Sequence, residues 1–243
     1  MRGLRHPWVL FDAGGTLLGP RESYGAVYAR LLAEEGVVVP ADVVDRALHA
    51  HWAHVDRTLP EGADRYGIHP GGEREYWLRF VEGTLARVPG VLDGPVLATR
   101  MVDRLREAFL DPGAWSVYDD VVPALRALTG MGARLGIVSN WDSRLPLLLE
   151  RLGLAGWFDA VAVSHEVGYE KPRPEPFLRA LTTLGGSPGL ALHVGDSPEL
   201  DEAGASAAGI ACVLVDRDGA DGIAGRFVPD LSSVPAIVRG GAA

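Results

Sequence analysis

The sequence predicts an α/β protein in which a doubly wound parallel sheet is interrupted by an inserted α-helical domain. Short apolar runs alternate with segments of helical spacing over most of the chain, a pattern that requires right-handed crossovers and parallel strands. From about residue 18 to residue 112 the strand patterns vanish, and helix-like stretches are separated by Gly and Pro instead. We therefore expect an α/β core formed by residues 1–17 and 113–243, with a helical cap domain at residues 18–112.

Apolar runs of four to six residues predict the strands of the sheet. They lie at residues 8–12, 134–139, 160–164, 191–195 and 211–215. Helical spacing predicts the helices of the inserted domain at residues 22–35, 41–56, 73–88 and 94–109. Outside the insertion, residues 119–128 and 145–152 have helical spacing, and Gly153 predicts a glycine cap at the end of the latter. A further helix is expected around Phe177, after a proline-rich approach.

The composition is that of a globular protein without a general affinity for anionic surfaces. The 243 residues can form one domain plus an inserted one. A net charge of −9 argues against a nucleic-acid or anionic-membrane surface, and no stretch reaches the ~18 apolar residues of a membrane span. The single cysteine, Cys212, cannot form an internal disulfide, which favours a reducing compartment. We expect a cytoplasmic monomer or weak homodimer that binds neither nucleic acid nor membrane.

Three of the predicted strands end in polar residues. At or just after these ends lie Asp12 with Thr16, Ser139 with Asn140, and Asp196 with Asp201. Gly14 and Gly15, after the first strand, leave backbone amides able to face an anion. Because open parallel sheets bind their ligands at the carboxyl edge, we expect these residues to lie close together.

The distribution of positive charge singles out one more residue. Only one of the 23 Lys and Arg residues is a lysine, Lys171. Its compact ammonium suits the binding of a small, multiply charged oxyanion beside a carboxylate. Taken by itself, a lysine at position 171 could equally be a chance occurrence in a sequence that is poor in lysine. Together with the polar strand ends, it completes a set of groups typical of an anion site.

These motifs resemble, in order and spacing, those of the haloacid dehalogenase (HAD) superfamily, in its subfamily with a helical C1 cap after the first motif. The matching motifs are Asp12 to Thr16, Ser139, Lys171, and Gly195-Asp196 through Asp201. Residues 138–145 and 158–177 also resemble the group of HAD-like hydrolase domain-containing protein 3. The resemblance implies a Rossmann-like, HAD-like core and a hydrolase that acts on a small phosphorylated metabolite.

The resemblance also implies a catalytic role for three residues. Asp12 would attack a phosphoryl group to give an aspartyl-phosphate, which water then hydrolyses. Ser139 would hydrogen-bond a phosphoryl oxygen. Lys171 would neutralise charge on the nucleophile and the phosphate.

A magnesium ion is the cofactor that the resemblance implies. Asp12, the main-chain carbonyl of Gly14 and Asp196 would hold Mg²⁺, since hard oxygen ligands suit that ion. Asp201 would support the metal site or Lys171. The residues expected to bind the substrate are Gly15, Thr16, Asn140 and Trp141.

At Gly14 the sequence departs from the family pattern. Family phosphatases carry an aspartate at this place, which acts as general acid and then as general base. General acid–base catalysis typically raises the reaction rate ~10²–10⁴-fold. We therefore expect slow turnover of alkyl phosphates and a preference for aryl or acyl phosphates. Asp142 and histidines of the helical domain such as His69 are candidates to replace the missing group.

Three alternatives remain open. The loss of the acid/base favours a non-catalytic binding or regulatory protein, although three retained charged groups around one buried point argue against it. A 2-haloacid dehalogenase would carry an aromatic residue in place of Gly14 and would not need Gly195-Asp196. A phosphonatase would form a Schiff base through a lysine of the cap, and residues 18–112 contain none.

Overall fold

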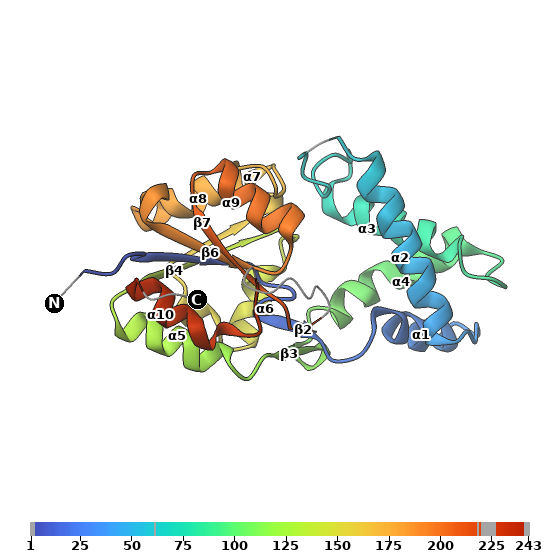
Figure 1. Ribbon diagram of the computed structural model, residues 1–243. Coiled ribbons are helices and arrows are strands. Elements are labelled where there is room, and N and C mark those ends of the chain that lie inside the picture. Colours follow the sequence, from blue (N-terminus) through green and yellow to red (C-terminus); the bar gives the residue numbers. More distant parts are fainter. Residues whose placement is uncertain (1–2, 61, 218, 220–226, 241–243) are drawn as a thin grey trace. The chain divides into compact units, whose positions relative to one another are not determined.

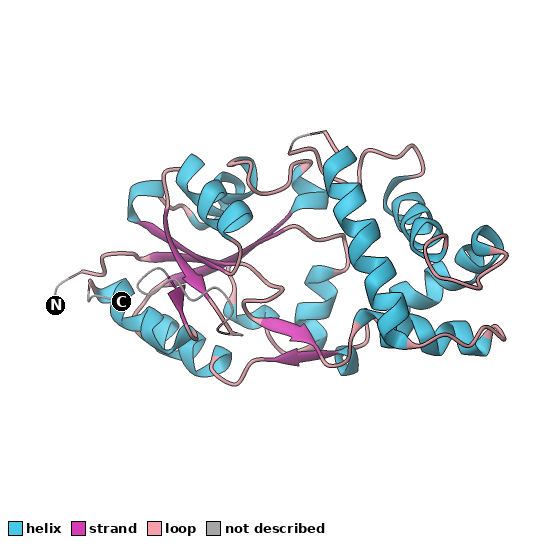
Figure 2. Ribbon diagram, turned by 45° about the vertical axis from the view of Figure 1, so that its right-hand side comes forward, coloured by secondary structure: helices cyan, strands magenta, loops and turns pink. Residues whose placement is uncertain are grey.

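A computed structural model describes residues 3–60, 62–217, 219 and 227–240. The chain divides into two compact units, one formed by Met1–Gly19 together with Val117–Ala243 and the other by Pro20–Ser116. The larger unit has an α/β fold, and the smaller one is built of helices (Figure 1, Figure 2).

A six-stranded sheet in the order β5-β4-β1-β6-β7-β8 forms the centre of the larger unit, and its neighbouring strands pair in parallel. The strands are β1 (Trp8–Phe11), β4 (Arg134–Ser139), β5 (Ala160–Val163), β6 (Ala191–Gly195), β7 (Ala211–Val215) and β8 (Phe227–Val228). All but β8 are strands that the sequence predicts. The fold class is therefore confirmed.

β1 occupies the middle of the sheet because its side chains are apolar toward both faces. Val9, Leu10 and Phe11 have no exposed surface, as expected of a strand covered on both sides. The strand pairs with β4 on one side and with β6 on the other. Because all three strands run in the same direction, their carboxyl ends share one edge of the sheet, where polar residues follow.

Helices cover both faces of this sheet. They are α5 (Val121–Gly130), α6 (Leu145–Arg151), α7 (Ser164–Val167), α8 (Glu175–Leu184), α9 (Ala203–Ala207) and α10 (Val234–Arg239). In Figure 1, α8 and α9 lie on one face, and α5 and α10 lie on the other. Phe177 and Leu181 of α8 pack against Leu10 and Val138 of the sheet. The predicted glycine cap after α6 is present, since Gly153 has a φ of 71°, a conformation that glycine adopts at little cost.

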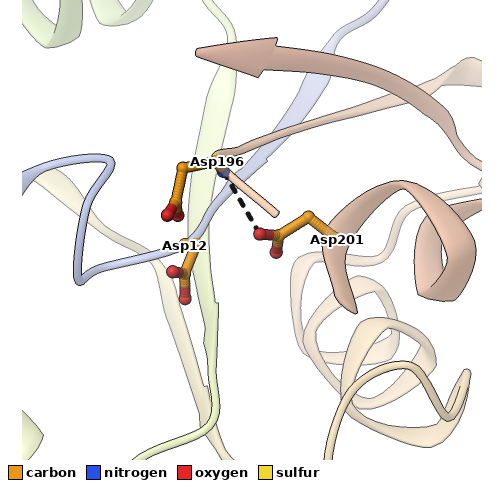
Figure 3. A group of neighbouring side chains, drawn as sticks. All are labelled: Asp12, Asp196 and Asp201. Atoms are coloured by element: carbon orange, nitrogen blue, oxygen red, sulfur yellow. Dashed lines mark hydrogen bonds between the residues drawn. The ribbon is translucent and has the colours of Figure 1, made fainter. Parts of the chain in front are cut away.

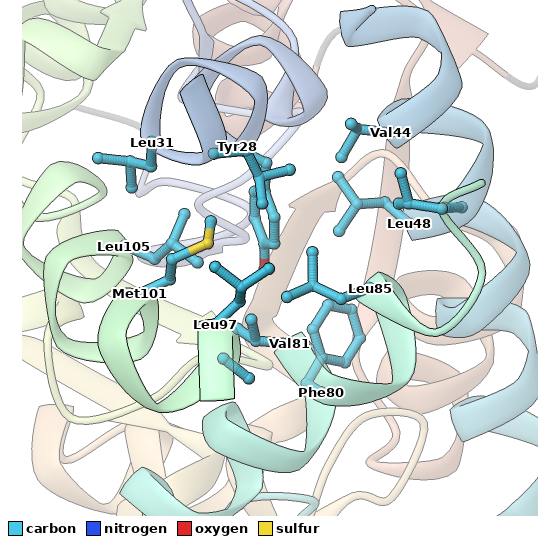
Figure 4. Packing of buried hydrophobic residues seen from close by; sticks show 14 of the residues in the cluster. Tyr28, Leu31, Val44, Leu48, Phe80, Val81, Leu85, Leu97, Met101 and Leu105 are labelled. Atoms are coloured by element: carbon cyan, nitrogen blue, oxygen red, sulfur yellow. The ribbon is translucent and has the colours of Figure 1, made fainter. Parts of the chain in front are cut away.

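The smaller unit has a hydrophobic core of its own. Its helices are α1 (Tyr24–Glu34), α2 (Ala41–Thr58), α3 (Gly72–Leu85) and α4 (Gly94–Ala108), close to the predicted ranges. Figure 4 shows side chains from all of these helices meeting in one cluster, among them Tyr28, Leu48, Phe80 and Met101. Among the helices of the described residues, none combines the length and the apolar character needed to span a bilayer.

Two short strands lie where the chain passes between the units. β2 (Leu18–Pro20) and β3 (Trp115–Val117) form a separate two-stranded sheet. Neither strand was expected from the sequence, because three residues are too few to display a period.

Candidate active site

Asp12 directly follows β1, at the carboxyl edge of the sheet. Its N–H donates to the main-chain oxygen of Val194 in β6 at 2.9 Å, which continues the strand pairing and fixes the residue. The side chain is largely buried, with 8% of its residue surface exposed. Lys171 Nζ lies 2.8 Å from Asp12 Oδ1. The sheet therefore brings together the carboxylate and the ammonium that the sequence analysis selected.

Lys171 lies between two carboxylates. Its Nζ is 2.6 Å from Asp201 Oδ1 as well as 2.8 Å from Asp12 Oδ1. Burial alone would lower the pKa of Lys171, but the charges of Asp12 and Asp201 outweigh it and raise that pKa above its ordinary value. The side chain is consequently a permanent cation at neutral pH.

Asn140 holds the main chain of Lys171 in place. The Asn140 Nδ2 donates to the Lys171 carbonyl at 3.0 Å, and the Lys171 N–H donates to Asn140 Oδ1 at 2.7 Å. We expected this side chain to contact the substrate. In the structure its amide pairs at both ends with the main chain of Lys171, and the contact with substrate stays a prediction.

Asp201 has donors on both of its oxygens. Oδ1 accepts from Lys171 Nζ and lies 2.8 Å from His193 Nε2, while Oδ2 accepts the N–H groups of Asp196 at 3.2 Å and Ser197 at 3.1 Å. Burial would raise the pKa of Asp201, yet Lys171 and His193 hold it well below its usual range. Because Asp201 is a carboxylate, His193 Nε2 is the donor in their contact.

Three carboxylates at this edge form a group suited to a divalent cation. Oxygens of Asp12, Asp196 and Asp201 all lie within 4.8 Å of one another (Figure 3). Burial and the charges of Asp12 and Asp201 raise the pKa of Asp196 to about 7, so negative charge here is only partly compensated. Since donors already engage both oxygens of Asp201, Asp12 and Asp196 are the carboxylates available to an ion. Such oxygen donors fit Mg²⁺.

The loop after β1 brings two of the expected substrate-binding residues next to Asp196. Gly15 has a φ of 75°, and a Cβ at this position would lie 2.4 Å from Asp196 Oδ2, so only glycine fits. Thr16 Oγ1 donates to Asp196 Oδ1 at 3.1 Å. This bond connects the Asp196 carboxylate to the loop after β1.

Ser139 and Trp141 lie at the end of β4, beside β1. Ser139 is the last residue of that strand and is buried. Trp141 lies over Gly14, because a Cβ at Gly14 would be 3.3 Å from Trp141 Cζ3. The indole thus covers the position at which family phosphatases carry their acid/base side chain.

Asp142, one candidate to replace that acid/base, is paired with Arg144. The residue has no exposed surface, and Arg144 Nε lies 3.0 Å from both of its carboxylate oxygens. Arg144 also donates its main-chain N–H to Asp142 Oδ1 at 3.0 Å. Both oxygens of this carboxylate are therefore engaged by Arg144 in the described structure. The other candidate, His69, belongs to the helical unit.

The structure adds two residues that the sequence analysis did not select. His193 is fully buried on β6, where its ring meets Phe177 edge to face at 4.9 Å between centroids. A histidine within an apolar strand can indicate a functional residue, but such a histidine more often only packs in the core. Arg217 donates to the carbonyl of Thr16, and nothing in the sequence connects two positions so far apart.

Comparison with known proteins agrees with this geometry. A model of the haloacid dehalogenase-like hydrolase family matches residues 7–209. Haloacid dehalogenase-like hydrolase domain-containing protein 3 of Mus musculus is 34% identical over 205 residues, which cover 84% of this chain and 80% of that protein. Glyceraldehyde 3-phosphate phosphatase of Methanopyrus kandleri is 38% identical over 116 residues, or 45% of this chain and 46% of that protein.

A solved structure is similar over nearly the whole chain. The crystal structure of a HAD phosphatase from Thermococcus onnurineus covers 97% of this chain and 99% of its own, with 26% identity and a TM-score of 0.64. The resemblance seen in the motifs is confirmed: the chain belongs to the haloacid dehalogenase-like hydrolase family.

Proposed function

We propose that this protein is a Mg²⁺-dependent phosphatase that hydrolyses a small phosphorylated molecule through a phosphorylated Asp12. The observation that carries the proposal is the buried contact of 2.8 Å between Asp12 Oδ1 and Lys171 Nζ, next to the partly uncompensated Asp196. A phosphoryl group beside Asp12 would meet a carboxylate nucleophile and a fixed cation at the same point. Relatives named as phosphatases support this reaction class.

In the first step, an oxygen of Asp12 attacks the phosphorus atom, and the bond from phosphorus to the leaving oxygen breaks. The leaving group departs with the bonding electron pair. Lys171 reduces the repulsion between the carboxylate and the phosphate, since its position and charge are set before the substrate arrives. In the second step, water attacks the phosphorus atom, and the bond from phosphorus to the Asp12 oxygen breaks. The proton of the water leaves with the phosphate product or passes to solvent, and the Asp12 carboxylate is restored.

The residues that would hold Mg²⁺ are Asp12, Asp196 and the carbonyl of Gly14. When bound, the ion supplies Lewis-acid stabilisation of charge on the phosphoryl oxygens. Thr16 orients Asp196 through its 3.1 Å hydrogen bond. Asp201 fixes the Asp196 main chain through the 3.2 Å bond to its N–H.

The leaving group determines which substrates react well. Gly14 has no side chain to protonate an alkoxide, and Trp141 lies over the place from which a donor would act. Aryl and acyl phosphates release anions that need no such proton. We therefore propose a preference for these substrates, with the helical unit Pro20–Ser116 as the cap that selects among them.

The test compares a phenyl phosphate with an alkyl phosphate in the wild type, Gly14→Asp and Gly14→Ala, with Asp12→Asn as the blank. We expect the wild type to favour the aryl ester, and Gly14→Asp to speed alkyl hydrolysis at least tenfold, the low side of the ~10²–10⁴-fold range of general acid–base catalysis. Gly14→Ala introduces the same Cβ near Trp141 without a carboxyl group, so it should give no gain.

Two results would contradict different parts of this proposal. Equal cleavage of both esters by the wild type, with no gain in Gly14→Asp, would refute the role of Gly14. Turnover no faster than in Asp12→Asn, or unchanged when Mg²⁺ is removed, would refute the Mg²⁺-dependent phosphatase.

A non-catalytic, phosphate-sensing protein is the second candidate, and the loss of a side chain at Gly14 is the observation that favours it. Fluoride adducts that mimic the transferring phosphoryl group separate the two. A transition-state mimic should bind tightly only to a working site, so tight Mg²⁺-dependent binding to the wild type and not to Asp12→Asn favours the enzyme.

A further inference from the structure

Arg217, just after β7, makes a set of contacts that converge on the nucleophile loop. Its Nε donates to the Thr16 carbonyl at 3.1 Å and its Nη2 donates to the same oxygen at 2.5 Å. The guanidinium also pairs with both carboxylate oxygens of Asp120, at 2.9 and 3.1 Å. The guanidinium also lies over the ring of Tyr118, with Cζ 3.8 Å from the ring centroid. The Arg217 side chain is only 11% exposed.

The partners of Arg217 are themselves fixed. Asp120 Oδ2 accepts the N–H of Leu231 at 2.7 Å, which ties the start of α5 to the segment before α10. Tyr118 donates its N–H to the Leu17 carbonyl at 3.2 Å. The guanidinium is therefore held by the scaffold on one side and offers its remaining donors to the loop on the other.

Thr16 connects Arg217 to the candidate metal site. Its carbonyl is held by Arg217, while its hydroxyl donates to Asp196 Oδ1. Gly15 packs so closely on Asp196 that a Cβ there would lie 2.4 Å from Oδ2. A rotation of the Thr16 peptide would therefore remove a hydrogen bond from Asp196 or bring the loop into its carboxylate.

We propose that Arg217 is a positioning residue of the active site, which holds Thr16 so that Asp196 is oriented for Mg²⁺. This role requires the planar guanidinium of arginine, which donates to the Thr16 carbonyl and to both carboxylate oxygens of Asp120 at once. A lysine ammonium cannot make all of these bonds and has no planar group to place over the Tyr118 ring. The effect on turnover rests on the proposed phosphatase function, whereas the effects on the loop and on Mg²⁺ binding do not.

The experiment uses Arg217→Met, which removes the donors, and Arg217→Lys, which keeps the charge. Arg134→Met is the matched control, since Arg134 also pairs with a carboxylate and a carbonyl, those of Asp159 and Leu184, but at the opposite, amino end of the sheet. Hydrogen exchange of the peptide containing residues 13–18 reports on the loop. Calorimetric titration with Mg²⁺ alone reports on the ion site. Thermal unfolding reports on general damage.

We expect faster exchange of residues 13–18 in both Arg217 variants and Mg²⁺ binding weakened about 10- to 100-fold in Arg217→Met, the range typical of lost outer contacts to metal ligands. Arg217→Lys should fall between Arg217→Met and the wild type. Arg134→Met should change neither quantity, even where its melting temperature falls.

The outcomes separate this proposal from the proposed function. Unchanged exchange of the loop, or unchanged Mg²⁺ affinity in Arg217→Met and Arg217→Lys, would overturn the positioning role. A wild type that binds no Mg²⁺ would overturn it too. A wild type that binds Mg²⁺ without hydrolysing phosphate esters, with weaker binding in the Arg217 variants, would refute the phosphatase and support the positioning role.

Discussion

The charges around Asp12 determine what each residue of the site can do. Lys171 contacts both Asp12 and Asp201, so one cation serves two carboxylates. Asp196 then adds a further carboxylate in a partly buried place, and its burial together with the charges of Asp12 and Asp201 raises its pKa to about 7. A divalent cation would remove that electrostatic cost, and its loss would leave Asp12 and Asp196 facing one another.

Removal of His193 tests how firmly the Asp201–Lys171 pair is held. His193→Phe keeps a ring against Phe177 but deletes the donor to Asp201 Oδ1. A hydrogen bond to a charged group contributes about 1.5–3 kcal/mol, so we expect kcat to fall at least about tenfold with little change in KM. Steady-state kinetics with an aryl phosphate measures this.

Two further variants control for packing. Phe177→Leu disturbs the same ring contact and keeps the donor, so its kcat should fall less than that of His193→Phe. His193→Gln offers an amide donor and should recover part of the activity. An undiminished kcat in His193→Phe would show that Asp201 and Lys171 keep their places without the histidine.

At the scale of elements, the packing of α2 against α3 depends on a neutral histidine. His51 of α2 is buried, its ring lies 5.0 Å from that of Phe80, and Gly83 leaves the space that the ring fills. Burial, and to a smaller degree the charges of Arg87 and His54, lower the pKa of His51 to about 4. Folding therefore favours the unprotonated imidazole.

This pKa predicts an acid-sensitive helical unit. Because the folded pKa is below the unfolded value of 6.5, the stabilisation is present above pH 6.5 and is lost as the pH falls toward 4. We expect the free energy of unfolding, measured in urea by circular dichroism, to fall between pH 7 and pH 5 by about 1 kcal/mol more in the wild type than in His51→Leu. Equal losses in the two proteins would contradict this assignment.

The elements that the sequence predicts are those with a clear period or a clear end. β1, β4 and β6 are apolar runs that stop at a polar residue, and α8 places Phe177, Ala180, Leu181 and Leu184 on one buried face. By contrast, β2, β3 and β8 have two or three residues each. Such strands form because tertiary neighbours are already in place, so local sequence carries no signal for them.

In the site too, features set by the local sequence could be predicted, whereas contacts between distant residues could not. The carboxyl edge of a parallel sheet is a topological rule, so Asp12, Ser139 and Asp196 could be placed from the ends of their strands. The protein partners of Thr16 and Asn140 could not be predicted, because each side chain bonds a group that is distant in the sequence. Arg217 was missed for the same reason.

At the scale of the whole molecule, the chain joins two units that each bury a core. The sheet unit supplies the charged residues of the candidate site, and the helical unit Pro20–Ser116 is inserted between its first strand and the rest of the sheet. An insertion at this point lengthens the connection that follows the loop after β1. Under the proposed function, the helical unit can vary in sequence while the order of motifs in the sheet unit is kept.

The central claim is that Asp12 becomes covalently phosphorylated during turnover, and it can be tested directly. The protein is mixed with an aryl phosphate and Mg²⁺, quenched in acid within the first turnover, and its peptides are analysed by mass spectrometry. The account predicts one added phosphoryl group on the peptide that contains Asp12, absent from Asp12→Asn. Hydrolysis of the ester with Asp12 unmodified, or with the phosphoryl group on another residue, would contradict it.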